Sequence, residues 1–328
     1  MIIRQGENKM TISFDEKFNQ IVSSLNDTNV PDYPREDSNT HVDFIELLAM
    51  TSGEDGLSLG DIQDRFFGET TEDDSAEKKD ANESFIKILF SIINIRIIQY
   101  GELYPFAIDD NNTILLKNSL STNQKLYLFL LVSSSLDFFK PFMTDLTSDF
   151  EKMVYEALGN FLPSAEVKSF GKNSEYSGTA VEKIKKLAID IGLNVNEPEL
   201  NQVNKGNVQE RGLDVVCWLP FADNCQNKIV ILCQCACGKN YEYKQHETHR
   251  FANYFSFYKV KPRHSLCVPF SLINPQDGKF YHSDYIEEDC LVFERLRLLN
   301  LTRMNNSFYD KMNSKKIVER CIHTFLKD

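Results

Sequence analysis

Two polar residues in the second half of the chain have the types and spacing that phosphodiester hydrolysis could use. Asp214 follows the turn at Gly212 in ERGLD and begins an apolar, β-branched segment, LDVVCWLPF. Gln234 lies in a second apolar segment, IVILCQCACG, which we expect to be the paired strand. Hydrolysis of a phosphodiester needs a cation held by hard oxygen ligands, a group that orients water and a positive charge beside the phosphate. An acid and an amide on paired strands can supply the oxygen ligands.

The alternation of side chains in the second segment makes Gln234 stand out. Cys233, Cys235 and Cys237 face one side of such a strand, where we expect them to pack in the core, while Gln234 and Ala236 face the other. An amide in so apolar a strand needs partners, because leaving it buried and unpaired costs roughly 1–3 kcal/mol. We therefore expect Asp214 and Gln234 to lie together and to share a metal ion.

The segments around these residues resemble a known family. DFEKMVYEAL, ERGLDVVCWLPF and KIVILCQCACGKNYEYK are similar to the core motifs of the PD-(D/E)XK, or restriction-endonuclease-like, nuclease superfamily, in the variants where Gln replaces the second acid. The resemblance covers residues 148–299. It implies that Asp214 is the main ligand of Mg²⁺ or Mn²⁺, that Gln234 adds a carbonyl oxygen, and that Glu151 completes the metal shell or orients water. Glu156 is the alternative to Glu151.

The lysine of this motif is displaced. The family places it two residues after the second ligand, where this chain has Ala236. The resemblance then implies a lysine from a neighbouring position, either Lys239 or Lys244. Loss of the lysine altogether would indicate a descendant that binds without cutting.

The elements expected around the site define the fold class. Phe150, Val154, Leu158 and Phe161 form one face of a helix, and the segments 213–221, 229–238 and 265–273 read as strands. We expect helices at 179–191, 242–258, 291–301 and 317–326. Helix, strands, helix, strand predicts an α/β (α+β) domain with a mixed central sheet flanked by helices.

The chain divides into three parts at this level. Residues 1–40 read as an irregular lead-in with one short helix, and residues 148–328 as the nuclease-like domain. Residues 41–147 read as a helical domain with a β-hairpin around an Asp-Asn-Asn turn, an order that fits either a winged helix or an all-helical module. Ser58 is the expected N-cap of a short helix there. The hairpin lacks basic residues, so we expect this domain to contact protein rather than DNA.

The charge is unevenly distributed. The net charge is −12. Residues 1–147 hold 12 Lys and Arg against 25 Asp and Glu, whereas residues 148–328 hold 24 against 23. The second part can therefore offer a local basic face, and the resemblance implies DNA as the substrate. The basic residues expected to meet its phosphates are Arg211, Arg250, Lys259, Lys261 and Arg263.

Composition and cysteine usage suggest the compartment and the partners. No apolar run reaches the roughly 18 residues of a membrane span, and the first residues lack a secretion signal. All eight cysteines lie between Cys217 and Cys321, mostly in apolar runs typical of reduced, buried thiols. We expect a cytoplasmic protein that acts as a homodimer or with a partner protein. The family resemblance extends to a role in bacterial defence against phage or foreign DNA.

Two other interpretations remain open. Zinc is one, given the cysteines together with His246 and His249, although the single-residue gaps of Cys233, Cys235 and Cys237 do not suit a zinc knuckle. The other is a non-catalytic subunit that uses a nuclease-like fold to dock a partner in a defence complex. No P-loop, dinucleotide-binding turn or G-x-S-x-G elbow is present, which disfavours ATPases, dehydrogenases and α/β-hydrolases.

Overall fold

The structure is a computed structural model, and it describes residues 12–27, 37–68, 75–204, 212–223, 225–303 and 306–324. The first half is mainly helical and contains one hairpin. Its elements are α1 (Phe14–Asp27), α2 (Ser38–Thr51), α3 (Leu59–Phe67), α4 (Ala76–Tyr100), β1 (Phe106–Ile108), β2 (Ile114–Leu116) and α5 (Thr122–Ser134). None of the helices in the described ranges is long and apolar enough to cross a membrane.

Local sequence signals account for several of these elements. Ser58 caps α3 as predicted, and it forms a reciprocal capping box with Asp61. The predicted hairpin is β1 and β2, whose turn is held by two amide groups that donate to the Asp109 carboxylate. Leu57, just before α3, pairs with Ile114 of β2 and adds a third short extended segment.

The second half builds a mixed α/β layer structure. Its main strands are β3 (Glu166–Ser169), β5 (Val215–Trp218), β6 (Val230–Cys235), β8 (Arg263–Cys267) and β11 (Cys290–Phe293). Its helices of eight or more residues are α6 (Met143–Phe161), α7 (Ala180–Ile191), α9 (Gln245–Ala252), α10 (Arg295–Thr302) and α12 (Lys315–Ile322). The shorter elements are β4 (Asn194–Val195), α8 (Glu197–Leu200), β7 (Phe255–Ser256), β9 (Ile273–Asn274), β10 (Lys279–Phe280) and α11 (Asn306–Asp310).

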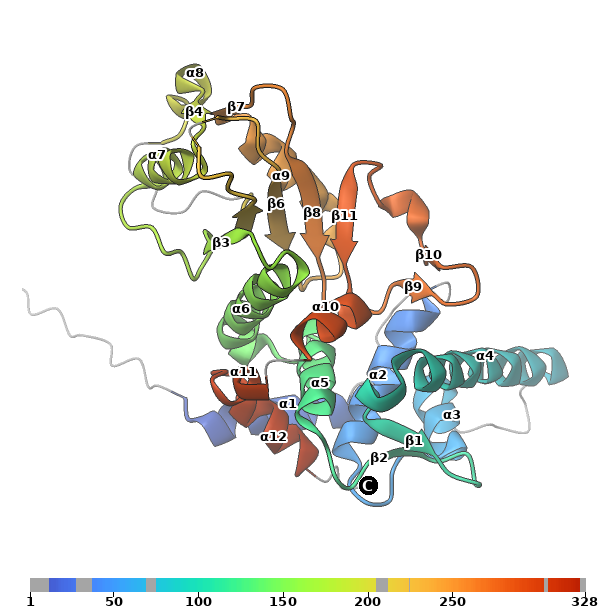
Figure 1. The fold of residues 1–328 in the computed structure, drawn as a ribbon. Helices are drawn as coiled ribbons and strands as arrows, with labels where there is room; N and C mark the ends of the chain where they lie inside the picture. The colour runs from blue at the N-terminus through green and yellow to red at the C-terminus, as the bar shows by residue number, and fades with distance from the viewer. Residues whose placement is uncertain are drawn as a thin grey trace, which may run out of the picture.

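The five main strands form one sheet in the order β11-β8-β6-β5-β3. Neighbours are antiparallel from β3 to β6 and parallel from β6 to β11. Alternate residues of β5 enter two different cores: Val215 and Cys217 join the core that includes α6, while Val216 and Trp218 join the core of α7 and α9. Helices therefore cover both faces, which confirms the predicted mixed α/β class (Figure 1).

The structure corrects the predicted conformation of two segments that follow main strands of the sheet. Residues 290–293 form a strand rather than the start of a helix, which begins only at Arg295. A run as short as Leu291–Phe293 has no distinguishing period, and parallel pairing with β8 decides its conformation. The helix expected at 242–258 ends at Ala252, and Phe255–Ser256 pairs with β4 instead.

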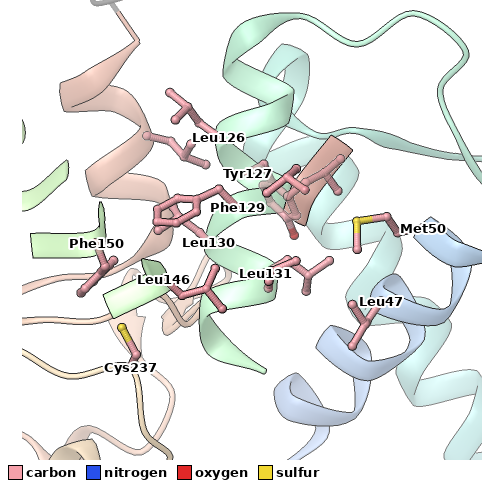
Figure 2. Close-up of a cluster of buried hydrophobic side chains, with 14 of the residues drawn as sticks. Leu47, Met50, Leu126, Tyr127, Phe129, Leu130, Leu131, Leu146, Phe150 and Cys237 are labelled. Carbon is pink, nitrogen blue, oxygen red and sulfur yellow. The ribbon is translucent and has the colours of Figure 1, made fainter. Parts of the chain in front are cut away.

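Helix α5 lies at the centre of the molecule, between α2 on one side and α6 on the other. Figure 2 shows Leu47 and Met50 of α2, and Leu146 and Phe150 of α6, on either side of α5. All of these belong to one continuous apolar core, and α11 and α12 also pack on α5. The predicted boundary at residue 147 therefore passes through a shared core.

A buried ion network also joins the two halves. Arg295 of α10 donates to both carboxylate oxygens of Asp43 in α2, at 3.0 and 2.7 Å. Arg96 of α4 donates to Asp43 at 2.6 Å and to Glu46 at 2.8 Å. Tyr127 of α5 donates to the second oxygen of Glu46. Ion pairing of this kind is what allows charges to be buried, because an unpaired buried charge costs several kcal/mol.

Candidate functional site

The sheet brings Asp214 and Gln234 together. Val215 of β5 pairs with Cys233 of β6 in antiparallel register, and the Asp214 amide donates to the Cys233 carbonyl. Asp214 therefore lies opposite Gln234, whose Nε2 donates to Asp214 Oδ2 at 2.7 Å. The predicted convergence of these two side chains is confirmed. The predicted packing of the three cysteines on the other face of the strand is confirmed too, since Cys233 and Cys237 are buried in the main core and Cys235 packs against it.

Backbone contacts fix the position of Asp214. Its carbonyl oxygen accepts from the amides of Phe170 and Gly171, which follow β3, at 2.7 and 3.0 Å. Its Oδ2 also accepts from the Cys235 amide at 2.7 Å. The carboxylate therefore bridges the start of β5 to the end of β6, and Oδ1 points toward Gly171.

Glu151 reaches this strand end from α6. A Cβ added at Gly171 would lie 2.5 Å from Asp214 Oδ1 and 3.2 Å from Glu151 Oε2. The two carboxylates thus flank the small space that Gly171 leaves open. Glu151 is buried, and the structure brings all three predicted metal ligands to one strand end.

Asn173, which the sequence analysis did not identify, orients Glu151. Its Nδ2 donates to Glu151 Oε2 at 3.1 Å and to the Ser148 carbonyl at 2.8 Å, and Ser148 Oγ donates back to Asn173 Oδ1. The loop after β3 thus ties the first turns of α6 to the site. The only signal in the sequence is the short GKN turn after a strand that was itself not predicted.

Burial shifts both acids toward the protonated form. It raises the pKa of Glu151 to about 7, and the nearby charge of Asp214 adds to the rise. It raises the pKa of Asp214 to about 6, although the Cys235 amide and then Lys244 and Lys172 oppose the change. Carboxyl groups that titrate this close to neutral pH in a cluster are typical of functional sites.

One buried polar atom at the site lacks a partner. Gln234 Oε1 accepts no hydrogen bond from any described residue, although its side chain is only 8% exposed. Asp214 lies close to Glu151 and contacts Gln234, whose amide presents Nε2 to it, and these three side chains carry the hard oxygen donors that suit Mg²⁺ or Mn²⁺. In the described part of the chain no three His, Cys, Asp or Glu side chains gather around a potential metal position, so the candidate set depends on the amide.

Of the two predicted lysines, Lys244 lies near Asp214, and Lys239 forms an ion pair elsewhere. Lys239 pairs with Asp137 at 3.0 Å. Lys244, in the short 3-10 helix before α9, lies close enough to lower the pKa of Asp214. Lys172, which directly follows Gly171, lowers the pKa of both acids and donates to Thr147 Oγ1 at 2.6 Å. Lys172 was not among the predicted residues, because the family motif places its lysine after the second ligand, which here lies in β6.

An open cavity of about 520 Å³ adjoins the site. Cys235, whose amide binds Asp214, lies in its wall together with Lys239, Lys244 and Thr147, which Lys172 contacts. Asp137 is the single acid in the wall. A cavity bordered by lysines beside two carboxylates can receive a phosphodiester.

The structure separates the basic residues predicted to bind DNA. Arg211 lies outside the described residues. Arg250 forms an ion pair with Glu247 at 3.0 Å. Arg263 pairs with Ile231 at the start of β6, the end opposite to Gln234, and Lys259 and Lys261 lie in the loop before it. These last three are therefore at the far end of the sheet from Asp214.

The residues considered for zinc are also dispersed. Cys217 and Cys233 are buried in the apolar core, whereas Cys225 is exposed in the loop between β5 and β6. His246 faces Glu287, and His249 stacks on His264 with ring centroids 3.5 Å apart. Among the described residues, this set is therefore not brought together at one point.

No protein-family model matches the chain, and comparisons with curated proteins and with solved structures return no match.

Proposed function

We propose that this protein is a divalent-cation-dependent nuclease of the PD-(D/E)XK type that hydrolyses phosphodiester bonds of DNA with Mg²⁺ or Mn²⁺. The observation that carries the proposal is the buried side chain of Gln234, which donates to Asp214 through its amide nitrogen and has no partner for its carbonyl oxygen among the described residues. A cation at this point would satisfy that oxygen and the charges of Asp214 and Glu151 together. The helix and strands that carry the three ligands have the order that the sequence resemblance implies.

The residues have distinct roles in this proposal. Asp214, Gln234 and Glu151 would hold the cation, which would supply positive charge against the developing charge on the phosphate. Glu151 titrates near neutral pH, so its ionised form can also accept a proton from the attacking water. Lys244, in the wall of the adjoining cavity, and Lys172, which contacts Thr147 of that wall, offset the negative charge of the phosphate.

The N-terminal domain is proposed to be a winged helix that contacts protein. The order α2, Leu57, α3, α4, β1, β2 and the pairing of Leu57 with Ile114 support this arrangement. The acidity of residues 1–147 disfavours contact with phosphates. A partner protein or a second copy of the chain is the proposed contact. By the family resemblance, the proposed role is defence against foreign DNA.

Cleavage of plasmid and linear DNA by the purified chain tests the proposal. We expect cutting with Mg²⁺ or Mn²⁺, none in EDTA, and a loss on the order of 10²-fold or more in Asp214→Asn, which removes the central ligand charge. Asp223→Asn is the matched control, because Asp223 is exposed between the far ends of β5 and β6. Cutting that survives Asp214→Asn would refute the assignment. Absence of both cutting and cation binding would favour the docking subunit instead.

Lysine variants test the assignment of the positive charge. Lys172→Met and Lys244→Met should each lower cleavage and move its pH profile upward, because both lysines hold the pKa of Asp214 down. Lys239→Met should leave the profile in place, since Lys239 pairs with Asp137. If the pH profile of cleavage is unchanged in both Lys172→Met and Lys244→Met, neither lysine belongs to the site.

A further inference from the structure

A second cavity lies at the opposite end of the sheet from the candidate site. It has a volume of about 670 Å³, within the range of small-molecule sites, and it lies where β6 and β8 begin. The C-terminal part of α9, β7 and the loop before β8 complete its wall. The cavity includes two of the basic residues that the sequence analysis assigned to DNA, Lys261 and Arg263.

The polar lining is basic, unlike the protein as a whole. Lys261 and Arg263 are exposed, and neither forms an ion pair with a described residue. His249 and His264 add two imidazoles, and Asp289 is the single acid. Two unpaired cations that converge on one cavity, in a chain with a net charge of −12, favour an anion with several oxygens.

The histidine pair gives the cavity a preformed polar side. The two rings stack with centroids 3.5 Å apart, and His264 is buried with its Nδ1 3.0 Å from Thr248 Oγ1. Burial and the neighbouring His249 lower the pKa of His264 to about 4. Its ring is therefore neutral at physiological pH. Because Thr248 Oγ1 donates to the Gln245 carbonyl, Nδ1 donates to Thr248, and Nε2 is left to accept a hydrogen bond, such as one from a sugar hydroxyl or a base amino group.

The remaining wall is apolar. Phe255 and Phe257 line the cavity, and Ile229 and Val260 are exposed large hydrophobic residues at its rim. Such a surface suits a flat ring, and a carboxylate such as that of Asp289 suits sugar hydroxyl groups. The lining thus combines surfaces for a base, a ribose and a phosphate.

We propose that this cavity is a binding site for a nucleotide, with the phosphate at Lys261 and Arg263 and the base on the apolar wall. The site is separate from the candidate nuclease centre, and its existence does not depend on that function. Helix α9 connects the two regions, because it begins beside Lys244 and carries His249 in its last turn. A bound nucleotide would therefore contact the element that follows one of the active-site lysines.

Titration calorimetry of the full chain in EDTA tests this site apart from any cation-dependent activity. The probes are AMP, ATP, adenosine, inorganic phosphate and a short single-stranded DNA. We expect saturable binding of AMP and ATP, and binding of adenosine about tenfold weaker or worse, because it lacks the charge-assisted contacts.

Two variants locate the bound phosphate. Arg263→Gln and Lys261→Gln should each weaken AMP binding about tenfold or more. Arg303→Gln, which replaces an exposed arginine at the end of α10, should not. Circular dichroism shows whether each variant remains folded.

Three results would overturn the proposal. One is the absence of saturable heat at millimolar AMP and ATP. A second is wild-type affinity for AMP in both Arg263→Gln and Lys261→Gln. The third is oligonucleotide binding that AMP does not displace, which would assign the basic loop to nucleic acid.

Discussion

Replacing Glu151 with glutamine should stabilise the folded protein at neutral and alkaline pH when divalent cations are removed. Burial and the charge of Asp214 raise the pKa of Glu151 from 4.5 to about 7. Between these two values the folded state holds a proton that the unfolded chain releases, so stability falls as the pH rises through this window. Above this window Glu151 is ionised in both the folded and the unfolded state. The rise in its pKa then corresponds to a free energy of unfolding that is lower by about 3 kcal/mol.

The glutamine variant avoids this penalty and keeps the local contacts. Its amide oxygen can still accept from Asn173, which donates to Glu151 in the native chain. At pH 8 we expect the free energy of unfolding of the variant to be about 3 kcal/mol higher, which in a chain of this length is a rise in melting temperature of about 4 °C. At pH 4.5, where the native carboxyl is protonated, the two proteins should melt within a degree or so of each other.

Thermal unfolding in EDTA at pH 4.5 and pH 8 measures the difference. Glu156→Gln is the control, because Glu156 lies on the same helix away from Asp214. An increase in the melting temperature of Glu151→Gln that is equal at both pH values, or no increase at pH 8, would refute the inference that burial raises the pKa of Glu151. Saturating Mg²⁺ at pH 8 should raise the melting temperature of the native chain more than that of Glu151→Gln, since a cation binds the ionised carboxylates.

Two further predictions concern packing around the site and between the halves. Gly171→Ala should reduce cleavage on the order of 10²-fold and lower the melting temperature, because its Cβ would displace the Asp214 carboxylate that bridges β5 to β6. Gly238→Ala, whose Cβ meets nothing within 4 Å, should cleave normally and keep its melting temperature. Arg295→Met should destabilise the fold by about 3–5 kcal/mol in urea unfolding, because it leaves Asp43 buried with one of its two arginine partners gone. A loss below about 1 kcal/mol would mean that the buried network is not a major stabilising feature.

The sequence predicts the part of the site that local pattern controls. Alternation places Gln234 on the face away from Cys233, and antiparallel pairing of two consecutive strands is enough to bring Asp214 beside it. The cap at Ser58 and the Asp109 turn are likewise local. These predictions depend on neighbours within a few residues or on one adjacent strand.

Features that depend on distant contacts were not predictable in the same way. The bond between Arg295 and Asp43 joins residues 252 positions apart, and no local pattern marks either partner. Asn173 and Lys172 lie in an irregular loop whose position depends on β3, a short strand with a weak signal. Lys261 and Arg263 were predicted to bind DNA from their charge alone. The sequence does not show at which end of the sheet their loop lies, so their distance from Asp214 could not be predicted.

The displaced lysine has a physical explanation in the packing of β6. Ala236 is 5% exposed and belongs to an apolar cluster with Leu266, so a lysine there would bury its ammonium group without a partner. The position of Asp214 is fixed by β5, but the long side chain of a lysine can reach it from the segment after either neighbouring strand. Lys172 follows β3 and Lys244 follows β6, the two strands that flank β5. Positive charge is therefore available at the site although the motif position holds alanine, and that favours a catalytic centre over a surface used only for docking.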